Sequence, residues 1–126
     1  MVHNLVKSED LDWLACAIDG EGTISGNPKS INPRFQIAVY NTDYSFAKKA
    51  ADLMGVKPCP LKYKVKGETR IIYSAYTSRK MTVLKILKQV ESRLVIKRMK
   101  ALAAIRSILD SYDIADIELR AYPSLP

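Results

Sequence analysis

Two acidic residues stand at the end of an apolar segment, and each is followed by a glycine. The segment runs from Leu14 to Gly22 as LACAIDGEG, so Asp19 and Glu21 close a predicted helix. Carboxylates at a helix C-terminus oppose the helix macrodipole, so a glycine-capped amphipathic helix alone does not explain them. The glycines allow sharp backbone turns and leave room for a neighbouring chain or a phosphate. The pattern indicates a site that uses carboxylate oxygens.

Hydrophobic periodicity predicts the elements that hold this segment in place. Strands at 23–25 and 34–40 follow the first helix, and a second helix covers about 43–54. A second hairpin spans 61–77, and further helices begin near residues 78 and 94. This αββαββα order predicts an α+β fold whose helices cover one face of an antiparallel sheet and leave the other open. In the last helix we expect an inward stripe of Val95, Met99, Leu102, Ile105 and Leu109.

The second predicted hairpin alternates apolar and cationic residues. Residues 61–66 read LKYKVK, so one face of the strand is apolar and the other is positive. A two-residue turn at 67–68 would pair Lys64 with Ile71. We favour a three-residue loop at 67–69, which pairs Lys66 with Arg70 and brings apolar residues opposite one another. This register predicts a basic, polar face of Lys62, Lys64, Lys66, Arg70 and Ser74, unless the lysines only form a solvated edge that discourages aggregation.

Composition and charge fit a single domain with a polyanionic partner. The chain has 126 residues and a net charge of +7, and residues 29–106 hold 18 of the 20 basic residues but only four acids. Cys16 and Cys59 form neither a disulfide framework nor a metal-ligand spacing, which favours a reducing compartment. With neither a signal peptide nor a membrane-spanning run, the sequence predicts an intracellular protein of the cytoplasm, nucleoid or an organelle matrix.

The LACAIDGEG segment resembles the LAGLIDADG signature of homing endonucleases. Identities to the signature are Leu14, Ala15, Ile18, Asp19 and Gly22, and Glu21 stands at its second acid. Cys16 departs from the signature, because the family usually has glycine where two such helices pack. The αββαββα order also resembles the family core, so the resemblance covers residues 8–109 of a single domain 1–126. No role is assigned to the tail, 110–126.

The resemblance implies a site-specific, metal-dependent DNA endonuclease. Glu21 and the Gly20 carbonyl would bind Mg²⁺, or another divalent metal such as Mn²⁺. Asp19 would support helix packing and the turn. Lys97 would stabilise the developing charge of the phosphate, and Asn41 would lie near the metal-bound water. Asn41 is equally well explained as a helix N-cap.

A single motif copy provides half of a double-strand cleavage site, which implies a homodimer on a long pseudo-palindromic DNA target. The motif helices would pair through Leu11, Leu14, Ala15 and Ile18, unless these residues serve the core of their own monomer.

The open face of the saddle-shaped sheet would follow the DNA major groove. Besides the lysine face, its DNA-binding residues would be Ser25, Asn27, Lys29, Arg34, Gln36 and Tyr40. A chain of this size favours an intron-encoded enzyme. The alternatives on the same fold are an RNA maturase or a DNA-binding regulator that has lost cleavage.

Overall fold

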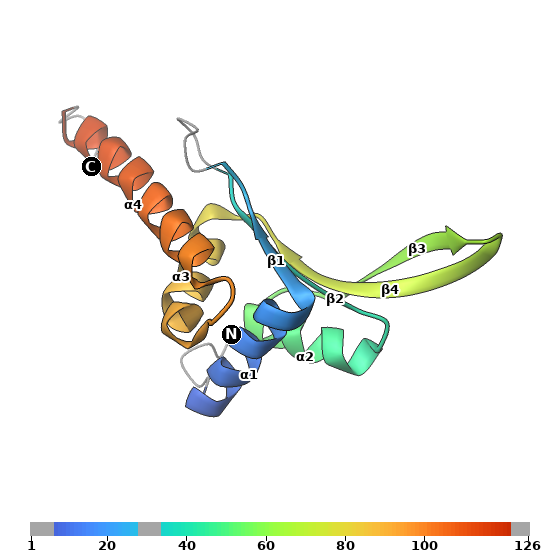
Figure 1. Ribbon diagram of the computed structural model, residues 1–126. Coiled ribbons are helices and arrows are strands. Elements are labelled where there is room, and N and C mark those ends of the chain that lie inside the picture. The colour runs from blue at the N-terminus through green and yellow to red at the C-terminus, as the bar shows by residue number, and fades with distance from the viewer. Residues whose placement is uncertain (1–6, 28–33, 122–126) are drawn as a thin grey trace.

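The structure is a computed structural model that describes residues 7–27 and 34–121, with side-chain surroundings up to residue 112 (Figure 1). The helices are α1 (Ser8–Glu21), α2 (Tyr44–Met54), α3 (Lys80–Val90), the short 3₁₀ helix η2 (Glu91–Arg93) and α4 (Arg98–Ala121). The strands are β1 (Gly22–Ser25), β2 (Gln36–Asn41), β3 (Cys59–Val65) and β4 (Glu68–Thr77). The predicted α+β order is therefore confirmed. Within the described residues, no helix combines the length and apolar character of a membrane span.

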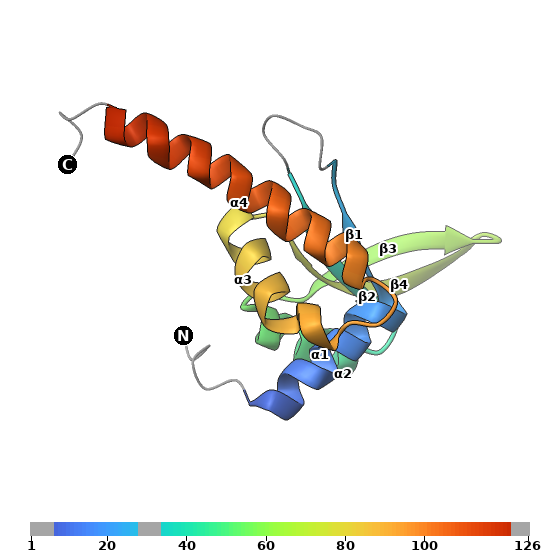
Figure 2. The same ribbon diagram turned by 60° about the vertical axis from the view of Figure 1, so that its left-hand side comes forward.

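The four strands form one antiparallel sheet in the order β1-β2-β4-β3. Helices α1 and α2 lie on one side of the sheet, and the β3–β4 hairpin extends well beyond them (Figure 1). Helix α3 packs against α1 and α4, and α4 runs past α3 and away from the sheet (Figure 2). One face of the central sheet is thus covered and the other is open, as the sequence predicts.

The core forms where α1, α2 and α3 meet the covered face of the sheet. Alternation along the central strands buries Ile37, Val39 and Ala75, which are 0% exposed. They pack with Ile18 of α1 and Leu87 of α3 in one cluster. Burying these side chains supplies the main stabilisation of the fold, at about 25 cal/mol for each Å² of apolar surface removed from water.

The β3–β4 hairpin has a different register from the predicted one. Lys66 and Gly67 form a two-residue turn with φ angles of 51° and 83°, and the strands then pair Val65 with Glu68. Neither the favoured loop at 67–69 nor the turn at 67–68 is present. Two-residue turns with positive φ at both positions match the right-handed twist of hairpin strands. Here that turn determines the register, at the expense of the apolar pairing that we expected.

The last helix differs from the prediction in both its start and its buried face. Residues 94–97 are not helical, and Val95 and Ile96 are 84% and 75% exposed. In the part of α4 up to residue 112, the buried residues are Ala101, Ala104 and Ile108. Of the predicted inward stripe, only Ile105 packs against the core, whereas Val95, Met99, Leu102 and Leu109 are exposed. Small alanines allow neighbouring helices to pack closely. Because the helix carries two apolar stripes, periodicity alone does not show which of them is buried.

The observed turn predicts opposite effects for its two positions. We expect Lys66→Asn to raise the free energy of unfolding by roughly 0.5 kcal/mol, because asparagine tolerates the left-handed backbone better than lysine. Gly67→Ala should lower it by about 1 kcal/mol, because alanine acquires a Cβ at a φ of 83°. Urea unfolding followed by circular dichroism measures both changes. A destabilising Lys66→Asn together with a silent Gly67→Ala would contradict this register.

Candidate functional site

Helix α1 presents two distinct faces to its surroundings. Leu14, Ala15, Ala17 and Ile18 are buried, whereas Asp12, Cys16 and Gly20 are exposed. Because the buried stripe packs in the monomer core, it fixes the C-terminal end of the helix and its acids in space. The prediction that Leu14, Ala15 and Ile18 pair two subunits is therefore wrong. Leu11 also packs against the core, although it is only partly buried.

The passage from α1 into β1 is direct and leaves no space for a side chain at Gly22. A Cβ atom at this position would lie 2.7 Å from the Ala38 carbonyl oxygen and 3.0 Å from the Ile18 Cα. Both neighbours are backbone atoms that cannot move away independently. Glycine at position 22 therefore lets the helix end pack directly on β2, one residue after Glu21.

Asp19 anchors the segment that precedes α4. Its Oδ2 accepts a hydrogen bond from the Val95 backbone N–H at 2.6 Å, and its Oδ1 accepts one from the Lys97 backbone N–H at 2.9 Å. Hydrogen bonds from N–H groups to a carboxylate are among the stronger ones in proteins. The contact confirms that Asp19 supports packing, and it also holds the backbone of Lys97, which the sequence did not reveal.

The environment of Asp19 favours its charged form. Burial by itself raises the pKa of the carboxyl, but hydrogen bonds from the Val95, Lys97 and Ile96 backbones, together with the positive charge of Lys97, outweigh it. The net result is a lowered pKa. Asp19 is therefore ionised at neutral pH, and its charge is used within the protein.

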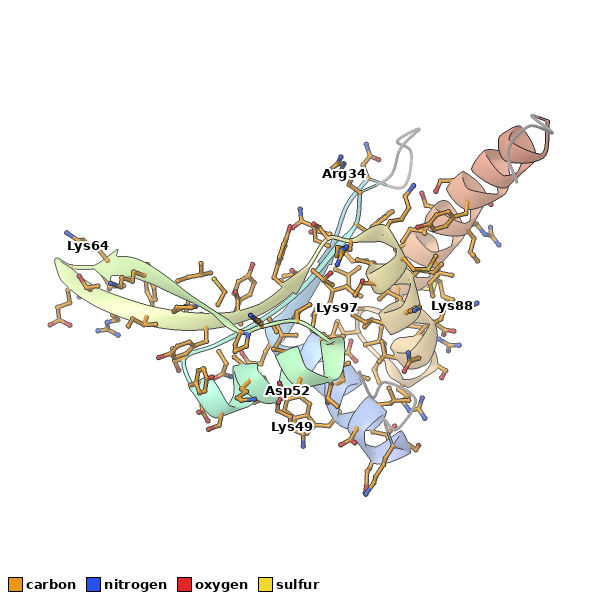
Figure 3. The ribbon with its side chains drawn as sticks, turned by 180° about the vertical axis from the view of Figure 1, so that it is seen from behind. Arg34, Lys49, Asp52, Lys64, Lys88 and Lys97 are labelled. Atoms are coloured by element: carbon orange, nitrogen blue, oxygen red, sulfur yellow. The ribbon has the colours of Figure 1, made fainter. Side chains whose placement is uncertain are left out.

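Lys97 bonds back to the end of α1. Its Nζ donates a hydrogen bond to the Asp19 backbone carbonyl at 2.6 Å, and its side chain is partly buried. Asp19 and Lys97 thus form a reciprocal pair. The Asp19 carboxylate accepts from the Lys97 backbone N–H, and the Lys97 ammonium donates to the Asp19 backbone carbonyl. Figure 3 shows Lys97 in the middle of the molecule, whereas Arg34 and Lys64 lie near the outer ends of the two hairpins.

Glu21 and Gly20 form the exposed end of α1. The Gly20 carbonyl lies too close to the helix end to accept a bond from within the helix, and both residues are exposed. A carboxylate and a helix-terminal carbonyl are hard oxygen donors, and they suit a divalent cation such as Mg²⁺. Within the described residues of this one chain, no three His, Cys, Asp or Glu side chains gather into a metal site. The donors present fit a partial site, which a metal would complete with water, phosphate or a second subunit.

Asn41 has a local structural role at the start of α2. Its Oδ1 accepts a hydrogen bond from the Asp43 backbone N–H at 2.8 Å. Asp43 is the N-cap of α2, and it accepts a bond from the Ser45 N–H at 2.9 Å. The N-cap interpretation of Asn41 is therefore wrong by two positions. The Asn41 oxygen is therefore occupied in this turn.

The first hairpin presents most of its predicted DNA-binding residues on the open face. Ser25 pairs with Gln36 across β1 and β2, and both side chains are exposed. Tyr40 follows the buried Val39, so alternation along the strand points its side chain to the open face as well. This side chain is partly buried. Asn27 and Arg34 are exposed near the outer end of this hairpin, and Lys29 lies outside the described residues.

The second hairpin does not present the predicted basic face. Lys62 pairs with Ile71 and Lys64 with Thr69, so these lysines share one side of the hairpin. Arg70 pairs with Tyr63 on the other side, and Lys66 lies in the turn. Ser74 is only 4% exposed, and its Oγ donates to the Cys59 carbonyl at 3.4 Å. The lysines and Arg70 are exposed, but a single face of five residues is wrong because the turn shifts the register by three residues.

The alternation of β4 predicts Ile72 and Tyr76 on the same side as Arg70 and Ser74, and in the structure this side belongs to the open face of the sheet. Sequence reasoning missed the exposed pair Val95 and Ile96 beside the end of α1, whose exposure follows from the hydrogen bonds to Asp19. No local pattern in the sequence indicates this pair.

Comparison with known proteins supports the fold. No sequence-family model matches the chain, and no curated protein matches it in sequence. A crystal structure of the homing endonuclease I-CvuI in complex with its target, in the presence of calcium, matches with a TM-score of 0.59 and 16% identity, over 87% of this chain and 74% of that chain. A second I-CvuI structure, with an I-CreI target and magnesium, has a TM-score of 0.56 and 17% identity, over 81% and 69% of the two chains.

These matches concern the fold that the structure shows. Helix α1 carries the motif-like segment, and the four-stranded antiparallel sheet is covered by helices on one side. At 16–17% identity the likeness concerns the arrangement of the backbone. The chain has the fold of the LAGLIDADG homing endonucleases.

Proposed function

We propose that the chain is a site-specific, double-strand DNA endonuclease of homing type that acts as a homodimer with Mg²⁺ or Mn²⁺. One observation carries this proposal: the exposed acid Glu21 ends the same helix whose Asp19 fixes Lys97 in place. Lys97, from a position far apart in the chain, is thus held at the helix end at which Glu21 lies, where the chain passes directly into β1. I-CvuI, which has this fold, was crystallised in complex with DNA in the presence of calcium or magnesium.

The residues at the end of α1 fit one half of a metal-dependent cleavage site. Glu21 and the Gly20 carbonyl would hold the cation. When bound, such a cation supplies a water of lowered pKa and neutralises negative charge on the leaving oxygen. The exposure of both groups lets the DNA backbone approach them closely.

Lys97 supplies a fixed positive charge for the phosphate that is cleaved. Its Nζ is held on the Asp19 carbonyl, so little reorganisation is needed when negative charge develops nearby. Asp19 acts through Lys97 and does not need to touch the DNA, which makes it a positioning residue. Asn41 would orient water or phosphate through its amide N–H₂.

A second copy of the chain would complete the site for the other DNA strand. The free face of α1 has Cys16 and Gly20 at helical spacing, and a Cβ atom at Gly20 would meet nothing within 4 Å. Small residues at this spacing allow another helix to approach closely. The hydrogen bond from Val95 to Asp19 places the exposed Val95 and Ile96 beside this face, where they add apolar surface. These features replace the interface residues that the sequence predicted.

The role of Glu21 is tested by DNA cleavage with and without Mg²⁺. With a random duplex library, Glu21→Gln should reduce cleavage about 10²–10³-fold or more while binding is retained. Glu9→Gln, an exposed acid in the first turn of the same helix, is the matched control and should cleave normally. Tight binding by the wild-type protein, with no cleavage in either metal, would indicate a DNA-binding regulator and contradict the proposal. Selective binding of RNA in place of duplex DNA would point to a maturase.

The role of Asp19 predicts a specific dependence of stability on pH. Because the folded state lowers the pKa of Asp19, its carboxylate stabilises the fold above pH 4, and this contribution is lost as the pH falls through the folded pKa. Asp19→Asn should cost about 1–2 kcal/mol at pH 7, and the difference from the wild type should narrow below about pH 4. Urea unfolding at pH 7 and pH 3 measures this, with Glu9→Gln as control. An equal difference at both pH values would rule out the charge as the cause.

The homodimer is tested by substitution on the free face of α1. Cys16→Glu should leave the monomer folded, because Cys16 is exposed, but should shift the protein from dimer to monomer in sedimentation experiments. Cleavage of both strands should be lost in parallel. Cys59→Glu changes the other exposed cysteine, on β3, and should leave the dimer intact. If Cys16→Glu remains dimeric, the subunits associate through another surface.

A further inference from the structure

An apolar strip crosses the open face of the sheet. Its members are Tyr40 of β2, Leu61 of β3, and Ile72 and Tyr76 of β4. Leu61 and Ile72 are direct partners across β3 and β4. Tyr40 and Tyr76 lie on diagonal positions of β2 and β4. Tyr76 and Leu61 are 43% and 42% exposed, so the strip presents large apolar side chains to solvent at both of its ends.

The placement of the strip on the open face follows from strand alternation. Ile37, Val39 and Ala75 are fully buried under the helices, so the residues next to them in the sequence point to the other side. On β4, the Tyr73 ring makes an edge contact with Tyr44 of α2 at 5.2 Å between centroids. Tyr73 therefore faces the helices, and Ile72 faces away from them.

The two tyrosines cover small residues that lie across from them. Tyr76 pairs with Ala38, and Tyr40 pairs with Ser74. Although Ala38 and Ser74 point to the open face, they are only 2% and 4% exposed. Each tyrosine thus lies across from a small residue on the neighbouring strand, and it occupies the space above that residue. The strip is consequently a packed surface with outward-facing rings.

The open face of β1 and of the outer end of β2 has the opposite chemistry. Ser25 and Gln36 form an exposed polar pair across β1 and β2, and Thr23 is exposed one step along β1. The sheet face is therefore divided into a polar part at Thr23, Ser25 and Gln36 and an apolar part that runs from Tyr40 over β4 to β3. A DNA duplex along this face would meet hydrogen-bonding groups on one part and hydrocarbon on the other.

Resting on the proposed function, we infer that the apolar strip reads the methyl group at C5 of a pyrimidine in the DNA major groove. This methyl, carried by thymine and by 5-methylcytosine, is the apolar group at the major-groove edge of the base pairs. A base pair that offers only donors and acceptors to the strip would lose hydrogen bonds to water without replacement. The polar pair, Ser25 and Gln36, reads donors and acceptors instead. The target thus has methyl-bearing pyrimidines where it contacts Tyr76, Ile72 and Leu61.

The test begins with selection of bound duplexes by the wild-type protein from a random library. Absence of any enriched sequence would overturn the proposed function, and this inference with it. In an enriched target, each thymine is replaced in turn by uracil, which removes only the methyl group. We expect affinity to fall about fourfold at each position that contacts the strip. Replacing such a thymine–adenine pair by 5-methylcytosine–guanine should retain more affinity than replacing it by cytosine–guanine.

Variants of the chain assign the effect to the strip. Ile72→Ala should abolish the uracil effect at one position, and Leu61→Ala, on the exposed edge strand, provides a second variant that leaves the core intact. Tyr76→Phe keeps the ring and should retain the uracil effect, whereas Tyr76→Ala should lose it. Gln36→Ala should weaken binding but leave the uracil effect in place. Unchanged affinity at every uracil, or a uracil effect that survives the strip variants, would overturn the inference while leaving the endonuclease proposal standing.

Discussion

The carboxylate of Asp19 holds together the two parts of the chain on which the candidate site depends. It joins the end of α1 to the segment before α4 by hydrogen bonds of 2.6 and 2.9 Å to the Val95 and Lys97 backbones. An acid near a helix C-terminus is unfavourable by itself, and here the N–H groups of another segment compensate for it. The anchored segment then carries the side chain of Lys97 back to the helix end. The arrangement of the acid and the lysine thus follows from one side chain that need not touch the substrate.

Both α1 and the sheet separate packing from function by using opposite faces. Helix α1 buries Leu14 and Ile18 and exposes Cys16 and Gly20. The sheet buries Ile37 and Val39 beneath the helices and leaves its other face to polar and aromatic residues. Because the side-chain periods of helix and strand are fixed, a residue on one face can be exchanged without changing the residues on the opposite face. The fold can therefore keep its core while the residues on the open face of the sheet and on the free face of α1 vary.

Local pattern predicts the order of elements and the acids of α1, but it does not predict contacts between distant segments. The αββαββα order followed from periodicity, and Glu21 was found from its position at a helix end. The hairpin register was missed because a turn with φ of 51° at Lys66 outweighed apolar pairing. The buried face of α4 was missed because Ala101 and Ala104 pack more closely than the larger residues. The contact of Asp19 with residues 95–97 has no signature in the sequence, since it depends on tertiary packing.

Gly22 links the chemistry of the site to the surface that would read the DNA. The residue follows Glu21 directly and begins β1, so no flexible linker separates the acid from the sheet. A side chain at position 22 would push against the Ala38 carbonyl at 2.7 Å and would move α1 relative to β2. Ala38 lies beneath Tyr76 in the apolar strip, so such a shift would alter both the acid and the reading surface. Under the proposed function, this contact between backbones would set the distance along the DNA between the bases that are recognised and the phosphate that is cleaved. A side chain at position 22 would then change specificity and cleavage together.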